Sequence, residues 1–81
     1  MRPKEVFTLY NEYLKPLYCE VEANNKLPME VLFEIHAAFD HLKRIYIDKE
    51  NESRCCEKAC SHIKRATLDA YKIILKRFTD R

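Results

Sequence analysis

The side chains best suited to chemistry fall in two short segments, 40–44 and 62–69, and each sets a histidine beside acidic and basic residues. The candidate catalytic residues are His62, Arg65, Asp69, Asp40, His41 and Arg44. A histidine positioned by a carboxylate and a cation could act as a general acid or base. The spacing from His62 to Arg65 and Asp69 places all three on one side of a helix.

A simpler interpretation of the same residues is a set of surface salt bridges, or a polar network that fixes the register of two helices. Arg65 and Asp69 are four residues apart and can pair along a helix surface, which contributes only about 0.2–0.5 kcal/mol. The sequence contains neither an H-E-x-x-H motif nor a glycine-rich phosphate loop. No catalytic motif is complete, and a non-enzymatic protein is the expectation.

Four cysteines form a second group with potential chemistry: Cys19, Cys55, Cys56 and Cys60. Cys56 and Cys60 are one helical turn apart on an apolar face, whereas Cys55 points about 100° away from Cys56. Zinc ligands usually come as closely spaced pairs on turns. Buried cysteines commonly pack as small apolar side chains. We therefore predict core packing without a metal or cofactor, with metal binding and redox chemistry as the alternatives.

Basic residues are concentrated in the second half of the chain. Residues 1–48 hold 6 Lys/Arg and 8 Asp/Glu, whereas residues 49–81 hold 9 and 5. The candidate nucleic-acid contacts are Lys58, Arg65, Lys72 and Lys76. Aromatic side chains that stack on bases are largely missing, because we place Tyr71 and Phe78 toward the core. A solvated helix face is the simpler interpretation of these charges.

The elements that must position these residues are helices. The chain has no glycine, which argues against tight hairpins, and its 47% hydrophobic and 35% charged composition suits amphipathic helices. Apolar periodicity predicts helices over 3–23, 28–47 and 52–79, with turns between them. We expect one all-α domain, 1–81, folded as an antiparallel up-down-up three-helix bundle. Pro16 lies inside the first helix and predicts a kink there, because proline removes a hydrogen bond.

The third predicted helix carries more apolar surface than two neighbouring helices cover. Leu68, Tyr71 and Leu75 widen its apolar side beyond the core positions. A helix that is apolar over so much of its surface usually contacts several partners. A chain of 81 residues also builds only a small core. We expect a homodimer or a protein partner.

Targeting and membrane signals are missing from the sequence. The first residues lack the apolar stretch of a signal peptide. No segment approaches the roughly 18 apolar residues of a membrane span. We expect a cytoplasmic protein with reduced thiols and no membrane partner.

Two segments resemble the HEPN superfamily of prokaryotic helical-bundle proteins: E-I-H-A-A-F-D-H-L-K-R, Glu34 to Arg44, and A-C-S-H-I-K-R-A-T-L-D-A-Y-K, Ala59 to Lys72. The resemblance covers about half of the chain. It implies a helical bundle, dimerisation, a place in toxin–antitoxin or antiviral defence systems and, in many members, RNA cleavage.

The nuclease motif of that family, an arginine followed after four to six residues by a histidine, is not reproduced. Arg54 and His62 have seven residues between them, and Lys58 stands too close to His62. HEPN bundles also normally have four or more helices. No catalytic role carries over, and His62 and Arg65 are the first residues to mutate if RNA is cleaved. Association is therefore the leading hypothesis for function, and RNA binding or cleavage is the alternative.

Overall fold

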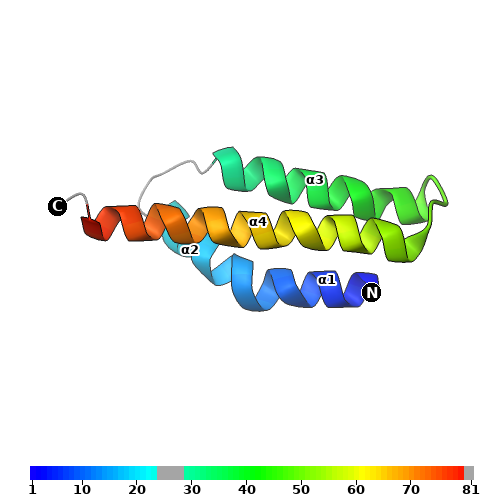
Figure 1. Cartoon of the computed structure of the whole chain (residues 1–81), viewed down its shortest axis with the longest axis horizontal. Coiled ribbons are helices and arrows are strands. Elements are labelled where there is room, and N and C mark those ends of the chain that lie inside the picture. The colour runs from blue at the N-terminus through cyan, green and yellow to red at the C-terminus, as the bar shows by residue number, and fades with distance from the viewer. Residues whose placement is uncertain (24–28, 80–81) are drawn as a thin grey trace.

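One long helix, α4 (Glu52–Thr79), forms the centre of the computed structural model, which describes residues 1–23 and 29–79. The other elements are α1 (Pro3–Leu9), the π-helical turn η1 (Tyr10–Leu14), α2 (Lys15–Ala23) and α3 (Met29–Tyr46). Because α1, η1 and α2 follow without a break, they form one bent helix. Figure 1 shows α3 running opposite to α1 and α4, which is the predicted up-down-up bundle. The predicted turn at 24–28, including the helix start at Pro28, lies outside the described residues.

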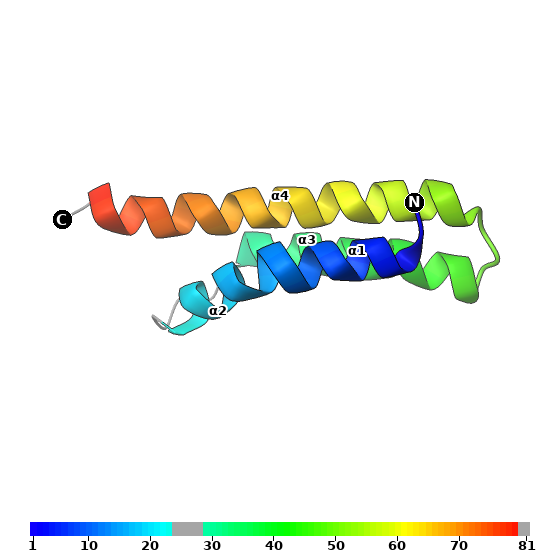
Figure 2. The same cartoon turned by 90° about the horizontal axis from the view of Figure 1, so that it is seen from below.

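The bend in the first helix has a local cause. Pro16 lacks a backbone N–H, and its ring would crowd the carbonyl of Glu12 in a regular α-helix. One turn earlier the helix widens, and the N–H of Lys15 donates to the carbonyl of Tyr10, five residues back. The helix axis changes direction between α1 and α2 (Figures 1 and 2). The predicted kink is confirmed, and the helix continues to Ala23 as expected.

The core lies between the inner face of α4 and the other two helices. Its members are apolar side chains spaced three, four or more residues apart along each helix. They are Val6, Leu14, Val21, Val31, Ala38, Leu42, Cys56, Ala59, Ile63, Ala66 and Ala70. The residues from α4 are mostly small, so neighbouring helices can approach its backbone. Helix α3 packs along α4 over most of its length, and α1, η1 and α2 each contact α4 as well.

The connection between α3 and α4 is short and closely bonded. Lys49 adopts φ = 57°, a left-handed conformation that glycine would normally occupy and that this glycine-free chain gives to a lysine. The N–H of Glu50 donates to the carbonyl of Arg44 at 3.0 Å. The Asn51 side chain then accepts from the N–H of Arg54 at 2.8 Å, which caps the start of α4.

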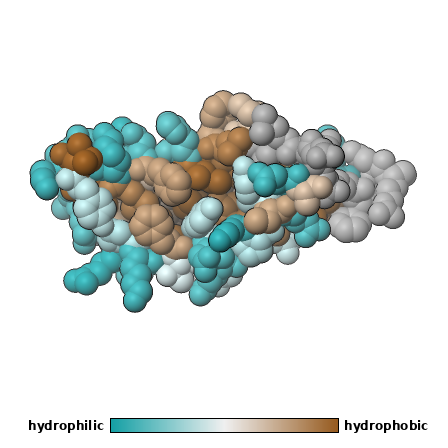
Figure 3. Space-filling view, turned by 180° about the vertical axis from the view of Figure 1, so that it is seen from behind, coloured by the Kyte–Doolittle hydropathy of each residue, from teal (hydrophilic) through white to brown (hydrophobic). Residues whose placement is uncertain are grey.

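Apolar side chains remain exposed on both faces of the molecule. On the outer face of α4, Leu68, Tyr71 and Leu75 are 55%, 52% and 54% exposed. Figure 3 shows the opposite face, where apolar atoms gather at the middle between α1 and α3. The rings of Tyr10 in η1 and Phe39 in α3 meet with centroids 6.5 Å apart.

Because α4 contains 28 residues and α3 only 18, the C-terminal end of α4 projects beyond the start of α3 (Figures 1 and 2). Tyr71 was placed toward the core from the sequence. That placement is wrong, because Tyr71 is more than half exposed. The side chain of Phe78 lies outside the described set.

Leucine-to-alanine substitutions at a buried and an exposed site test this division between core and surface. Leu14 is fully buried and Leu68 is exposed. We expect Leu14→Ala to lower the free energy of unfolding by about 2–5 kcal/mol, because it leaves a cavity. We expect Leu68→Ala to change it by less than about 0.5 kcal/mol. Urea denaturation followed by circular dichroism measures both, and equal losses would contradict the arrangement.

Candidate functional site

Two histidines from different helices meet at the outer edge of the contact between α3 and α4. The rings of His41 and His62 stack with centroids 5.3 Å apart and planes 15° from parallel. Both side chains are partly buried. The segments singled out in the sequence therefore do converge, and His41 and His62 form the centre of a polar cluster.

Glu34 holds His62 in place from α3. The Nδ1 atom of His62 lies 2.8 Å from Oε1 of Glu34. A carboxylate only accepts hydrogen bonds, so Nδ1 is the donor and Nε2 is left for other partners. Arg65 reaches the same carboxylate, with Nη1 3.8 Å from Oε2. The Glu34 side chain is 18% exposed and that of Arg65 is 65% exposed, so the second contact is the more solvated one.

Glu34 is the residue that sequence analysis missed. It entered only as the first residue of the segment Glu34 to Arg44, without a role of its own. A usable signal was present, because Glu34 and His41 are seven residues apart and therefore share one side of α3. The polar cluster is defined here as Glu34, His41, His62 and Arg65.

The surroundings of His41 favour the neutral form of its imidazole. Burial lowers the pKa of its imidazole first, and the positive charges of Arg44, His62 and Lys58 lower it further, against the opposing effect of Asp40. Within the described part of the chain, the buried Nδ1 atom of His41 has no hydrogen-bond partner.

The other predicted site residues stay outside this cluster. Asp40 and Arg44 pair with each other across one turn of α3, at 2.8 Å and partly exposed. Among the described residues Asp69 makes no ion pair, so the Arg65–Asp69 pair that the spacing allows does not form and Arg65 faces Glu34 instead. The candidate set thus separates into the polar cluster, one surface pair and an isolated carboxylate.

A row of cations borders the polar cluster along α4. Lys58, Arg65 and Lys72 are exposed and follow at intervals of seven residues, so they line one edge of the helix. We call these three residues the basic row. Lys76 is also exposed on α4. Arg81, the last basic residue of the chain, lies outside the described residues.

Three of the four cysteines pack in the core as predicted, and Cys19 does not. Cys55, Cys56 and Cys60 are buried and unbridged, and Cys19 is exposed. Cys55 is buried despite pointing away from Cys56. Burial and the nearby Glu52 carboxylate raise the pKa of the Cys56 thiol, which disfavours the reactive thiolate. Over residues 1–23 and 29–79, no cluster of His, Cys, Asp and Glu side chains is arranged to hold a metal ion.

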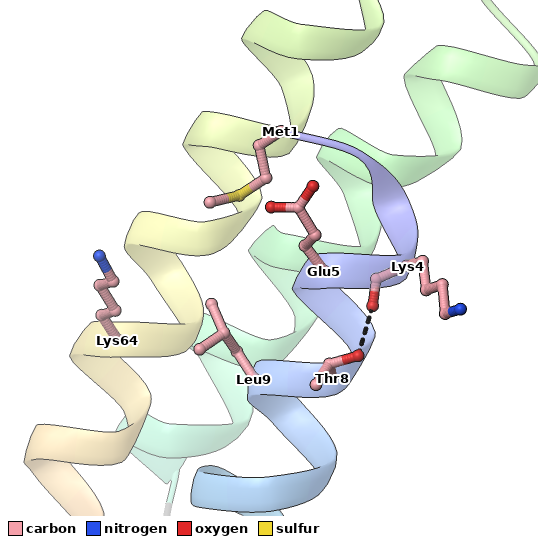
Figure 4. A pocket seen from close by; sticks show the side chains of 6 residues that line it. All are labelled: Met1, Lys4, Glu5, Thr8, Leu9 and Lys64. Carbon is pink, nitrogen blue, oxygen red and sulfur yellow. Dashed lines mark hydrogen bonds between the residues drawn. The ribbon is translucent and has the colours of Figure 1, made fainter.

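A hollow of about 430 Å³ opens between α1 and α4 (Figure 4). Met1 and Leu9 supply its apolar walls, and Lys64 borders it from α4. The remaining lining residues are Lys4, Glu5 and Thr8, and the Thr8 hydroxyl donates to the carbonyl of Lys4 at 2.8 Å. The lining is more apolar than polar, which suits a large apolar side chain better than a charged ligand.

Comparisons with models of protein families, with curated proteins and with solved structures found no match. None of the helices in the described ranges is both long enough and apolar enough to cross a membrane. The site is therefore argued from its geometry alone.

The lowered pKa of His41 predicts a pH-dependent stability. The unfolded chain, with an ordinary histidine pKa of about 6.5, binds more protons than the folded chain as pH falls. We expect the free energy of unfolding to be lower at about pH 5.5 than at about pH 7.5, and His41→Gln to reduce this difference. Urea denaturation at the two pH values measures it.

His36 provides the control, because it is exposed on the same helix. His36→Gln should leave the difference in the free energy of unfolding between the two pH values as it is in the unmodified protein. Equal effects of the two substitutions would show that His41 is not the responsible group.

Proposed function

We propose that this chain works by association, as a homodimer or as a partner-binding subunit, and that its binding surface is the outer face of α4. The observation that carries the proposal is the row formed by Leu68, Tyr71 and Leu75, each more than half exposed. We call these three residues the apolar row. Exposed apolar groups that form a continuous patch commonly mark a binding surface, whereas single ones do not.

The position of the apolar row supports this proposal. Its residues are spaced by three and four, so they stay on one side of α4 over two turns. The core residues Ala59, Ile63, Ala66 and Ala70 occupy a different side of α4, which packs against the other helices. The helices α1, α2 and α3 therefore leave more than half of each side chain in the apolar row exposed.

Burial of the apolar row would supply binding energy. Apolar surface contributes about 25 cal/mol for each Å² removed from water, or about 1.5–3 kcal/mol for a fully buried Leu side chain. Because the three side chains are already partly covered, each gains less than that full amount. The gain suits a reversible association.

Sedimentation velocity over a wide range of concentrations tests self-association. We expect the native chain to dimerise weakly at high micromolar concentration, and Leu68→Ser/Leu75→Ser to weaken the dimer at least about tenfold, because each serine removes apolar contact worth over 1 kcal/mol.

Phe33→Ser/Ile47→Ser is the matched control, since both residues are exposed and neither belongs to α4. It should leave the association unchanged. A native chain that stays monomeric throughout would contradict self-association.

A second candidate function, HEPN-like RNA binding or cleavage, is favoured by the neighbourhood of the polar cluster and the basic row. His41, whose pKa is lowered, stacks on His62, and Lys58 and Arg65 lie along the same edge of α4. A neutral imidazole can accept a proton from a ribose hydroxyl, and cations can hold the phosphate. Tyr71, exposed beside Lys72, offers one ring for base stacking.

Labelled single-stranded RNA tests this second candidate. We expect binding that weakens as salt increases, a smaller salt dependence in Lys58→Gln, and cleavage reduced at least about 100-fold in His62→Ala. Lys15→Gln and His36→Ala are the controls, because both side chains are exposed away from the polar cluster. Absence of salt-sensitive RNA binding would contradict this second candidate function. Unchanged cleavage in His62→Ala would contradict only the assignment of the cleavage site to His62.

A further inference from the structure

We propose that the preferred occupant of the outer face of α4 is an acidic amphipathic helix of another protein rather than a second copy of this chain. The inference rests on the proposed function, because it names the partner for the same surface. It depends on three neighbouring features: the apolar row of α4, the basic row along one edge of it, and the hollow between α1 and α4 beside Lys64.

The spacing on α4 indicates that the partner is helical. Lys64, Leu68, Tyr71 and Leu75 alternate at intervals of four, three and four residues. This is the seam pattern of a coiled coil, in which the side chains of one helix fit between those of another. The basic row lies immediately beside the seam, at positions where charged side chains of a coiled coil pair with those of the partner helix and so determine which partner binds.

Charge argues against a second copy as the best occupant. Two α4 helices packed antiparallel would bring the basic rows Lys58, Arg65 and Lys72 against each other. Packed parallel, they would set Lys64 against Lys64 inside the seam. Like charges at such positions oppose association. Glutamates flanking the apolar face of a different helix would instead pair with the basic row.

The hollow provides a place for one apolar side chain of the partner helix. It lies between α1 and α4, beside Lys64, with Leu9 and Met1 facing into it (Figure 4). At about 430 Å³ it can take a large apolar side chain that continues the partner's apolar face past Leu68 toward α1. The surface is thus apolar at its centre and on the α1 side, and cationic on the α3 side.

A pair of synthetic peptides tests the proposal. Both are three-heptad helices with leucine at the seam positions, and they differ only in carrying glutamate or lysine at the flanking positions. We expect fluorescence anisotropy to show the glutamate peptide binding the full chain at least about tenfold more tightly than the lysine peptide at low salt. Added salt should narrow the difference, because it screens the exposed charges.

Reversing one charge locates the interaction. Lys72→Glu should weaken binding of the glutamate peptide about fivefold and strengthen binding of the lysine peptide. Lys15→Glu makes the same change of net charge on α2, where Lys15 is exposed, and should alter neither peptide's binding beyond the general charge effect. Equal binding of the two peptides, or equal effects of the two substitutions, would overturn the proposal.

The remaining outcomes separate this inference from the proposed function. If neither peptide binds while the chain dimerises through Leu68 and Leu75, the partner is not an acidic helix, but the proposal of association through α4 stands. If neither peptide binds and the chain stays monomeric, both are wrong. Binding to phosphatidylserine vesicles without binding to the glutamate peptide would assign the surface to anionic lipid and overturn the inference.

Discussion

The packing of small side chains on the inner face of α4 is the constraint on which the rest of the molecule depends. Ala59, Ala66 and Ala70 have no measurable exposure, and they let α3 on one side and the first helix on the other lie close to α4. Because these residues fix the rotation of α4 about its axis, they also fix what the helix presents elsewhere. Leu68 faces outward for that reason, and His62 lies at the edge next to α3.

The helices could be predicted because apolar periodicity is visible in a single sequence. The bend could be predicted because Pro16 lacks a backbone N–H donor in any surroundings. The form of the bend could not be predicted. The widened turn at Tyr10–Leu14 inserts an extra residue between Val6 and Leu14, yet both remain buried against α4. Whether a proline helix kinks, breaks or widens depends on which choice keeps such residues in the core, and that is a property of the packed bundle.

The polar cluster was also predictable only in part, because its geometry depends on how the helices pack. His41 and His62 were identified because their types are rare and their neighbours charged, but their stacking depends on how far α3 is shifted along α4. The same shift brings Glu34 to His62 and draws Arg65 away from Asp69. A pair within one helix can be foreseen from spacing, whereas its competition with a carboxylate on another helix cannot.

Lys58 and Arg65 serve both proposals, so cations alone cannot tell an acidic helix from RNA. The apolar row distinguishes the two ligands, because a helix would bury it and RNA would not. A phosphodiester chain on the basic row would leave Leu68 and Leu75 in water, with only Tyr71 suited to a base. An amphipathic helix covers all three while pairing with the same cations. Burial of apolar surface is the larger and less salt-sensitive gain, which favours a protein partner on the outer face of α4.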